Sequence, residues 1–546
     1  MSTFAEIVLA RARDSKTGLR FGDRSWSWAQ VVAEGTRRAG LLRRLGARHV
    51  GVLLENVPDY VFWIVAAALE GAVVVGINPT RRGAGLARDI RHTDCDLLVT
   101  EERLAGLLDG IDHGVPVLDV DGDLDLRDEE LPSRVPDADR TLLLLFSSGS
   151  TGAPKAVICS NGRLGVLAES LAARTELTRD SVSYLCMPLF HGNSAMMNLA
   201  PAMHVGSTVV LARKFSASGF ARDVHRYGVT FVNYVGRTLS YVLAQPERAE
   251  DRDSALRLAV GTEASPVEAE RFAERFGCRV SEGYGMSEGV LRINRTPAAP
   301  PGSLGLPVGG ADVRVLRQDT GTECAPAEFD ESGVLVNAEE AVGQIVAIGG
   351  AAAFEGYYNN PEAQAERVRG DDFWTGDLAY RDADGFFYFA GRTADWLRVD
   401  GENFAAASVE RVLQRWDPVE AVAVYPVPDP TTGDQVMAAL QLRSDFDPDA
   451  FAAFLAEQPD LGTKWLPRFV RITPELPTTA SNKTARTPLR QAAWRTDDPV
   501  YFRQGPTPSY HRLTPERREA WERGFASAGR TGAAPRGETG DSFSHN

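Results

Sequence analysis

The chain has 546 residues, of which 43% are hydrophobic and 24% are charged, and its formal net charge is −15. These values are typical of a globular protein long enough for two or more domains. The acidic balance argues against nucleic acid or an anionic membrane surface as the main partner. The longest apolar stretch, residues 61–69, is too short to span a bilayer, and the N-terminus lacks the apolar core of a signal peptide. We therefore expect a cytoplasmic protein without an integral membrane segment.

Cysteine and lysine are both scarce. The five cysteines lie far apart, without a metal-binding spacing, and are expected to be buried free thiols in a reducing compartment. Only five of the 59 basic residues are lysines, at positions 16, 155, 214, 464 and 483. In a chain so rich in arginine, a lysine is a candidate for a role that arginine does not fill.

Along the first several hundred residues, short apolar runs alternate with helical patterns. Residues 49–54 and 72–78 read as buried strands, and an amphipathic helix runs between them from Pro58 to about residue 69. The same rhythm returns at 206–212, 229–235 and 256–264. Repeated strand–helix–strand units predict an α/β fold, with parallel sheets covered by helices.

After residues 386–396 the pattern changes. Residues 421–427 and 436–442 read as two strands joined by a turn, followed by a helix at 447–458 and a strand at 468–472. This predicts a separate α+β domain of about 100 residues. We expect an N-terminal domain at 1–391, a hinge at 392–396, a C-terminal domain at 397–500 and an extension at 501–546. The extension is predicted to be disordered from about residue 527.

A loop rich in glycine and hydroxyl groups follows the apolar strand at 141–146. It runs from Ser147 to Gly152 and is followed by Lys155. Pro154 precedes the lysine and Ala156 follows it, so the loop does not match the common Gly-Lys-Ser/Thr phosphate loop. Inward-turned amides and a mobile cation still fit an anion. By itself the segment is equally compatible with a flexible turn.

Four further segments carry residue types that a nucleotide site requires. "EGYGMSEG" (282–289) combines an aromatic ring, a tight glycine turn, a hydroxyl and a carboxylate. "TGD" (375–377) places a carboxylate in a tight turn, where it can grip ribose hydroxyls. Arg392 lies at the domain junction, and Lys483 lies in a polar loop near the end of the last domain.

In order and approximate spacing, these five segments resemble the signature set of the adenylate-forming superfamily, over roughly residues 20 to 500. Residues 357–368 and 391–412 are most similar to the fatty-acid transport and very-long-chain acyl-CoA ligase branch. The resemblance implies a large N-terminal domain of helix-covered sheets with a smaller mobile C-terminal domain. It also implies a two-step reaction that uses ATP, Mg²⁺ and coenzyme A. A carboxylic acid first becomes an acyl-adenylate with release of pyrophosphate, and its acyl group then passes to coenzyme A with release of AMP.

The resemblance also implies roles for individual residues. Lys155 would hold the β- and γ-phosphates, Ser287 would touch the α-phosphate, and Glu288 would hold Mg²⁺. Lys483 would bridge the carboxylate and the α-phosphate, and Tyr284 would stack on adenine. The remaining implied residues are Asp377 and Arg392 for ribose; Ser147, Ser148, Gly149, Ser150, Thr151, Gly152, Gly261, Thr262, Glu263, Ala264, Gly285 and Met286 for the nucleotide; His191, Asn193, Tyr234, Val235 and Gly236 for the acyl pocket; Arg398, Gly401 and Glu402 for coenzyme A; and Ala394 and Asp395 for the hinge.

Several alternatives stay open at this point. The acceptor could be a carrier-protein thiol, and the acid could be a medium-chain, long-chain or steroid side-chain acid. His191 is either a residue of the acyl tunnel or a core histidine. An amino-acid substrate is disfavoured, because His191 stands where an aspartate would pair with the substrate ammonium. A non-catalytic nucleotide-binding protein would not need Lys483. A homodimer is compatible with the sequence.

Overall fold

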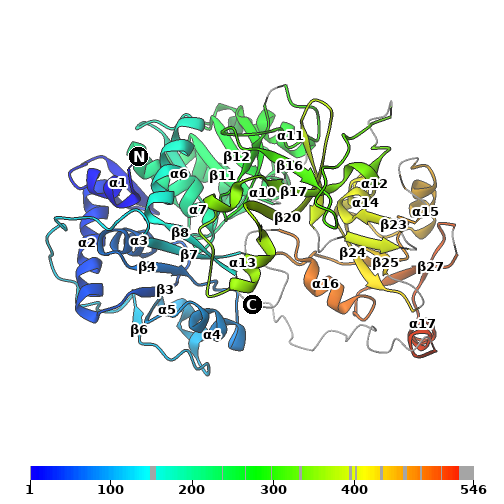
Figure 1. Cartoon of the computed structure of the whole chain (residues 1–546), viewed down its shortest axis with the longest axis horizontal. Helices are drawn as coiled ribbons and strands as arrows, with labels where there is room; N and C mark the ends of the chain where they lie inside the picture. The colour runs from blue at the N-terminus through cyan, green and yellow to red at the C-terminus, as the bar shows by residue number, and fades with distance from the viewer. Residues whose placement is uncertain are drawn as a thin grey trace.

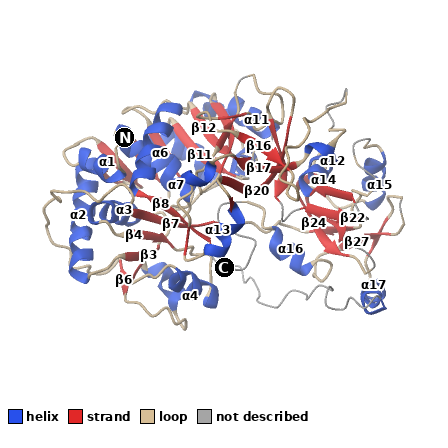
Figure 2. Cartoon of the chain, viewed as in Figure 1, coloured by secondary structure: helices blue, strands red, loops and turns tan. Residues whose placement is uncertain are grey.

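The computed structural model describes residues 2–147, 155–236, 238–262, 264, 266–296, 298–330, 335–392, 396–399, 402–430, 434–458, 461, 464–479, 483–505 and 507–527. Figure 1 shows the chain extended along one axis, with the N-terminal sheets on one side and α14 to α17 at the opposite end. Figure 2 shows helices packed against the faces of the N-terminal sheets. The predicted α/β class and the division into a large and a smaller part are confirmed.

The first sheet has seven strands in the order β18-β8-β7-β4-β3-β5-β6. Its parallel part comprises β3 to β7, and β8 runs antiparallel to both β7 and β18. The strands are β3 (His49–Leu53), β4 (Val73–Gly76), β5 (Leu97–Thr100), β6 (Val117–Asp119), β7 (Thr141–Ser147), β8 (Lys155–Ser160) and β18 (Tyr357–Tyr358). The neighbouring helices are α2 (Trp28–Leu45), α3 (Pro58–Glu70), α4 (Gly83–His92) and α5 (Glu102–Ala105), with the short turn η1 (Gly106–Leu108).

The second sheet has nine strands in the order β15-β14-β13-β12-β11-β9-β10-β1-β2. The strands from β1 and β10 through β13 pair in parallel, and the two edges are antiparallel. Its strands are β1 (Thr17–Phe21), β2 (Arg24–Ser27), β9 (Val182–Leu185), β10 (Thr208–Leu211), β11 (Phe231–Val235), β12 (Leu258–Thr262), β13 (Arg279–Gly285), β14 (Arg292–Asn294) and β15 (Leu306–Pro307). The helices are α1 (Phe4–Ala10), α6 (Asn161–Arg174), α7 (Gly192–Ser194), the π-helix η2 (Ala195–Leu199), α8 (Ala200–Val205), α9 (Ala217–Tyr227), α10 (Thr238–Leu243), η3 (Ala249–Asp253) and α11 (Pro266–Phe276).

A third, antiparallel sheet follows in the chain. It contains β16 (Val313–Leu316), β17 (Gly343–Ala347), β19 (Val368–Arg369), β20 (Asp372–Arg381) and β21 (Phe387–Arg392). Its helices are α12 (Ala338–Ala341), η4 (Gly350–Ala353) and α13 (Pro361–Arg367). The side chain of Asn360 accepts a hydrogen bond from the Ala363 amide at 3.0 Å, and Pro361 occupies the first turn, so the start of α13 is fixed.

The C-terminal part contains a two-stranded and a five-stranded sheet. The strands are β22 (Trp396–Val399), β23 (Glu402–Ala405), β24 (Val419–Pro428), β25 (Asp434–Leu442), β26 (Phe469–Ile472), β27 (Val500–Arg503) and β28 (Tyr510–Arg512). The helices are α14 (Ala406–Leu413), α15 (Pro448–Ala456), α16 (Arg486–Ala492) and α17 (Pro515–Ser527). The predicted α+β character is confirmed. The turn expected at 431–434 and the tail from 528 lie almost entirely outside the described residues.

The five-stranded sheet continues past residue 500 with β27 and β28, and α17 follows them. The helix is charge-rich, yet Phe525 is only 1% exposed, and Trp521 packs edge-on against Phe469 at 5.4 Å between ring centroids. We therefore include residues 500–527 in the proposed C-terminal domain.

The core follows from the long apolar runs of the sequence. The fully buried α3 and the strands β3, β4 and β7 lie at the centre of the largest hydrophobic cluster. Buried parallel strands need apolar residues on both faces, which explains why their sequences are nearly continuous hydrophobic runs. All five cysteines are free thiols; four are buried and Cys278 is partly exposed. In the described part of the chain, no helix is both long and apolar enough to cross a membrane.

Candidate active site

Several of the predicted site residues of the large domain follow the carboxyl ends of parallel strands. His191 follows β9, Gly236 follows β11 and Ala264 follows β12. Ser287 and Glu288 follow β13, the next strand of the same sheet. Since β9, β11, β12 and β13 are parallel neighbours, these residues meet at one edge. Ligands of open α/β sheets bind at this kind of edge.

His191 opens the short helix after β9. Its ring is partly exposed and lies 4.4 Å from the Phe190 ring, between centroids. Within the described chain, its Nε2 atom is buried and has no hydrogen-bond partner. Burial, together with the nearby charge of Lys483, lowers the pKa of His191 to about 4. The ring is therefore neutral at physiological pH.

A buried amide network adjoins the next turn. The Asn233 side chain donates to Asn193 Oδ1, and Asn198 Nδ2 donates to Asn233 Oδ1 at 2.7 Å. Asn198 belongs to the π-helical turn η2, a backbone irregularity that is frequent at functional sites. Asn193, predicted for the acyl pocket, is partly exposed and is anchored by this network.

Tyr234 and Gly261 are direct neighbours in the register of β11 and β12. A Cβ atom on Gly261 would lie 2.5 Å from the Tyr234 ring, so only glycine allows this close approach. Tyr234 is fully buried and its hydroxyl donates to Glu282. Gly236 has a φ of 58°, and its amide donates to the Thr262 carbonyl at 3.1 Å.

For these residues the structure fixes the surroundings, and their binding roles stay predictions. Val235 is buried beside Thr262, and Ala264 is partly buried in the cluster under this edge. Glu263, which was assigned to the nucleotide, lies outside the described residues.

The tyrosine segment differs in detail from the expected tight turn at Gly285. Tyr284 and Gly285 are still in β13 and pair with β14, because the strand continues as a hairpin arm. The turn comes one step later, at Met286–Gly289, where the Gly289 amide donates to the Met286 carbonyl at 3.0 Å. Gly289 closes it with a φ of 67°. Ser287 and Glu288 occupy the centre of this turn.

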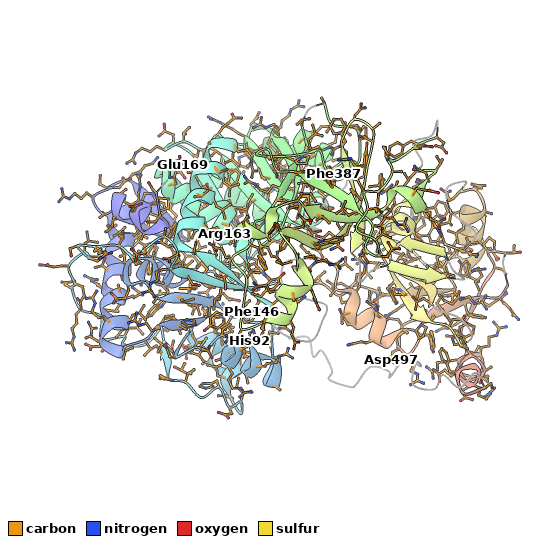
Figure 3. All side chains as sticks on the ribbon, in the orientation of Figure 1. His92, Phe146, Arg163, Glu169, Phe387 and Asp497 are labelled. Atoms are coloured by element: carbon orange, nitrogen blue, oxygen red, sulfur yellow. The ribbon has the colours of Figure 1, made fainter. Side chains whose placement is uncertain are left out.

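Two partners hold the turn in place. Arg163 on α6 donates through Nη2 to the Ser287 carbonyl at 2.5 Å (Figure 3 labels Arg163). The hydroxyl of Tyr357, on β18, donates to Glu288 Oε1 at 2.5 Å. Burial, with the adjacent Glu288 charge, raises the pKa of Tyr357, so the phenol stays a donor.

Asp377 lies within strand β20 and not in an open turn as expected. The strand continues through the Thr375–Asp377 segment because Gly376 adopts a φ of 75° inside it. The Asp377 amide donates to Thr375 Oγ1 at 3.1 Å, and Tyr284 donates its hydroxyl to Asp377 Oδ2 at 2.6 Å. In the register of β20 and β21, Asp377 stands opposite Arg392. The two residues predicted for ribose are thus cross-strand neighbours.

The glycine-rich loop joins two antiparallel strands, with Ser147 ending β7 and Lys155 opening β8 as register partners. The common phosphate loop joins a strand to a helix. This loop therefore differs from it both in sequence, as expected, and in the elements that it connects. Residues 148–154, including the predicted Ser148, Gly149, Ser150, Thr151 and Gly152, lie outside the described chain. Lys155 is only 6% exposed, and its Nζ lies 3.2 Å from Glu366 Oε2.

The C-terminal part contributes Lys483. The Thr479 amide donates to the Lys483 carbonyl at 2.7 Å, and the Lys483 amide donates to Thr479 Oγ1 at 3.2 Å. Lys483 lies close enough to His191 for its charge to lower the histidine pKa. A cation from the C-terminal part therefore reaches the edge of the nine-stranded sheet.

The other predicted residues of the small domain are only partly placed. Arg398 lies on β22 and Glu402 opens β23, its antiparallel partner strand. Gly401, Ala394 and Asp395 lie outside the described residues. The coenzyme A and hinge assignments stay predictions.

Four residues at this site had no predicted role: Arg163, Tyr357, Glu366 and Arg367. The last three belong to the segment "YYNNPEAQAERV", which marked the resemblance without suggesting contacts. The partners of Arg163, Tyr357 and Glu366 lie far away in the sequence, 211 residues for the Lys155–Glu366 pair, whereas Arg367 contacts Trp374, seven residues away. The sequence signal that could have suggested a role was the Tyr357 phenol and the adjacent opposite charges of Glu366 and Arg367.

The donor set fits a magnesium ion held mainly by a nucleotide. Mg²⁺ keeps several waters and is usually bound by one or two carboxylates plus substrate phosphates. Glu288 is partly exposed and is oriented by Tyr357, which suits a single carboxylate ligand. Among the described residues, no cluster of three or more His, Cys, Asp or Glu side chains forms a protein-only metal site.

Comparison with known proteins agrees with this geometry. Residues 8–358 match the AMP-binding enzyme family, and residues 408–483 match the AMP-binding enzyme C-terminal domain. A steroid-22-oyl-CoA synthetase of Rhodococcus jostii is 47% identical, covering 97% of this chain and 98% of its own. The medium/long-chain-fatty-acid–CoA ligase FadD17 of Mycobacterium tuberculosis is 44% identical, covering 91% of this chain and 98% of its own.

Solved structures show the same fold. ATP-bound MatB from Rhodopseudomonas palustris has a TM-score of 0.77 at 21% identity, covering 89% of this chain and 98% of its own. O-succinylbenzoate coenzyme A synthetase from Bacillus subtilis, in complex with AMP, has a TM-score of 0.74 at 24% identity, covering 90% of this chain and 98% of its own.

These matches define the class of the protein. The chain belongs to the AMP-binding enzyme family of adenylate-forming enzymes. It is an acyl-CoA ligase of the AMP-forming acid–thiol type, whose substrates are ATP, coenzyme A and a small-molecule carboxylic acid.

Proposed function

We propose that this ligase activates a large hydrophobic carboxylic acid, with a steroid side-chain acid as the first candidate. The support is the similarity to the Rhodococcus jostii steroid-22-oyl-CoA synthetase, at 47% identity over 97% of the chain. A medium- or long-chain fatty acid is the second candidate, supported by the FadD17 ligases at 43–44% identity over 91% of the chain.

The first step joins an anionic acid to a polyanionic nucleotide. A carboxylate oxygen attacks the α-phosphorus of ATP, and pyrophosphate leaves. Lys155 would neutralise the β- and γ-phosphates, the Ser287 hydroxyl would donate to the α-phosphate, and Lys483 would hold the two reacting groups together. Mg²⁺ on Glu288 would supply charge neutralisation at the phosphates. The assignment is supported by the Met286–Gly289 turn, which places Ser287 and Glu288 after β13, and by the proximity of Lys483 to His191 at the same sheet.

The second step transfers the acyl group. The thiol of coenzyme A attacks the acyl carbonyl, and AMP leaves with the carbon–oxygen bond electrons. Arg398, Gly401 and Glu402, around the β22–β23 connection, would line the pantetheine path after the small domain rotates about residues 392–396. Glycine at 401 would let the narrow arm pass close to the backbone.

The neutral His191 supports a hydrophobic acid more than an amino acid. A substrate ammonium group would need a carboxylate partner near the entrance of the acyl site. The described neighbours of His191 include the Phe190 ring and the cation Lys483, neither of which stabilises an ammonium by ion pairing. His191, Asn193, Tyr234, Val235 and Gly236 remain the proposed acyl-side residues.

The test is pyrophosphate release over a panel of acids, followed by product masses with and without coenzyme A. The panel would contain steroid side-chain acids, fatty acids of graded length and aromatic acids. A steroid acid should give the highest kcat/KM and a CoA thioester. Highest turnover with a linear fatty acid would replace the first candidate by the second. ADP and phosphate as products would contradict adenylation.

Three finer proposals accompany this function. Mg²⁺ should be required, and chelation by EDTA should abolish pyrophosphate release. The protein should be cytoplasmic, as its composition and its free thiols indicate. The third proposal is that the protein forms a homodimer, and analytical ultracentrifugation would measure its mass in solution.

A further inference from the structure

The last turn of α13 brings two charged side chains of opposite sign to the proposed nucleotide site. Figure 1 shows α13 between the strands of the seven-stranded sheet and β20. Glu366 contacts Lys155, which opens β8, whereas Arg367 contacts the Trp374–Gly376 segment of β20. One short helix therefore contacts both segments to which the phosphates and ribose of ATP were assigned.

Glu366 supplies the anion that Lys155 faces in this structure. The Lys155 ammonium is nearly inaccessible to water and lies 5.9 Å from the centre of the Tyr357 ring. A buried ammonium is costly unless an anion accompanies it. Glu366 Oε2 provides that charge at 3.2 Å, although 59% of its side chain is exposed. An exposed carboxylate can turn into solvent when a stronger anion arrives.

The Arg367 guanidinium packs against Gly376, the residue that precedes Asp377. A Cβ atom on Gly376 would lie 1.9 Å from Arg367 Nη1, so the guanidinium occupies the space that a side chain would fill. Nη1 also donates to the Trp374 carbonyl at 3.4 Å. Within the described chain, the Nε atom of Arg367 is buried and has no hydrogen-bond partner. This guanidinium therefore has one donor that no described residue uses.

The surroundings place Arg367 between two assigned subsites. On one side is the Gly376–Asp377 segment, where ribose would bind. On the other is the Tyr357 hydroxyl, which Arg367 also approaches and which donates to Glu288, the proposed magnesium ligand. The phosphate chain must run between these two sides. A planar guanidinium matches the spacing of phosphate oxygens and stays charged at any working pH.

We propose that the last turn of α13 is part of the nucleotide site. Arg367 donates to the phosphate chain of ATP, and Glu366 holds Lys155 in position until the β- and γ-phosphates displace its carboxylate. Arg367 is thus a binding residue, and Glu366 is a positioning residue that competes with ATP. This inference rests on the proposed function, because it takes the ATP orientation from that assignment.

Neutralising these adjacent residues should have opposite effects on nucleotide binding. Calorimetry with ATP and Mg²⁺, without acid or coenzyme A, would measure the dissociation constants. Glu366→Gln should tighten ATP binding by about threefold or more, because a partly exposed ion pair no longer competes. Arg367→Gln should weaken it by about tenfold, the loss of one charged hydrogen bond. Arg367→Lys should recover part of that loss.

AMP separates the two roles, since it lacks the β- and γ-phosphates. Glu366→Gln should leave AMP affinity unchanged, and its effect on ATP should vanish in a Lys155→Ala background. The matched controls are Glu362→Gln and Arg369→Gln, which make the same charge changes at exposed positions of the same segment. Equal effects of the control and test variants would overturn the proposal, because they would indicate long-range charge alone.

The inference and the proposed function fail in different ways. Wild-type protein that does not bind ATP would contradict the proposed function itself. Wild-type protein that binds ATP, with folded Glu366→Gln and Arg367→Gln variants of unchanged affinity, would overturn the inference alone. Thermal melting of each variant without ligand would establish that it is folded.

Discussion

At the scale of single residues, the proposed ribose site depends on one carboxylate whose geometry is already fixed. Asp377 is held through its own amide by Thr375 and through its side chain by Tyr284. Thr375 is anchored in turn, since its hydroxyl donates to the Ile345 carbonyl at 2.8 Å. Binding ribose would exchange the tyrosine hydroxyl for two sugar hydroxyls, without moving the backbone.

This arrangement predicts the effect of removing the carboxylate. Asp377→Ala should weaken ATP binding by about tenfold to a hundredfold, because two sugar hydroxyls replace the Tyr284 hydroxyl and one net charged hydrogen bond contributes about 1.5–3 kcal/mol. The variant should remain folded. Calorimetry with ATP and with 2′,3′-dideoxy-ATP checks the role. Wild-type protein should discriminate between the two nucleotides and the variant should not; equal discrimination by both would refute ribose binding.

His191 predicts a pH dependence of stability. Its pKa in the folded protein is about 4, below the usual 6.5, so the unfolded chain takes up a proton first as the pH falls. The contribution of the neutral ring to stability is complete above pH 6.5 and is lost as the pH falls towards 4. The melting temperature of wild-type protein, relative to His191→Gln, should therefore decrease over this window. A pH-independent difference would contradict the depressed pKa.

At the scale of elements, α17 shows how a charge-rich segment can be structural. Its outward side carries exposed charges such as Arg523, which pairs with Glu519 at 3.7 Å. Its inward side places Trp521 against Phe469, and Phe525 against Trp494 with 6.2 Å between ring centroids. The guanidinium of Arg468 also lies 5.4 Å from the Trp521 ring. The helix thus closes one face of the small sheet.

Truncating that face should destabilise the C-terminal domain. Phe525→Ala should reduce the free energy of unfolding by about 3–5 kcal/mol, because it removes a buried ring and leaves a cavity. Arg523→Ala, on the exposed side, should change it by less than about 0.5 kcal/mol. Urea denaturation followed by tryptophan fluorescence measures both. Similar values for the two variants would show that α17 is dispensable for folding.

The elements differed in how far the sequence predicted them. Buried strands such as β3, β7 and β24 were predictable, because their apolar runs are long and end at clear turns. The two-residue strands β15, β18 and β19 were not, since pairing and not composition defines them. The strand character of Asp377 was missed because glycine normally signals a turn, whereas here Gly376 is accommodated inside β20.

The site itself was predictable only as a set of residue types. Lys155, Glu288, Asp377 and Lys483 stood out from their motifs. Their partners did not stand out. Tyr357 contacts Glu288 and Glu366 contacts Lys155 only because the fold brings distant segments together, and no local sequence pattern indicates such contacts. The cross-strand register of Asp377 and Arg392 likewise depends on three-dimensional pairing.

At the scale of the whole molecule, we expect the two proposed steps to use two different orientations of the small domain. Lys483→Ala should abolish adenylate formation and still convert supplied acyl-adenylate to the thioester. Gly401→Leu should spare the adenylate step and block thioester formation, because a side chain would fill the pantetheine path. Pyrophosphate release and thioester formation would be assayed separately. Equal loss of both half-reactions in folded variants would exclude the division of labour.

Strand β21 joins the proposed ribose site to the proposed hinge of the small domain. It begins in the antiparallel sheet, places Arg392 opposite Asp377, and ends immediately before the proposed hinge. If this residue pair binds ribose as proposed, the nucleotide would hold the strand that precedes the proposed hinge. Coupling of this kind is reciprocal: if the nucleotide favours one orientation, locking the domain in that orientation must tighten nucleotide binding by the same factor. A crosslink between the two parts would then act as an affinity switch, made without touching any residue of the pocket.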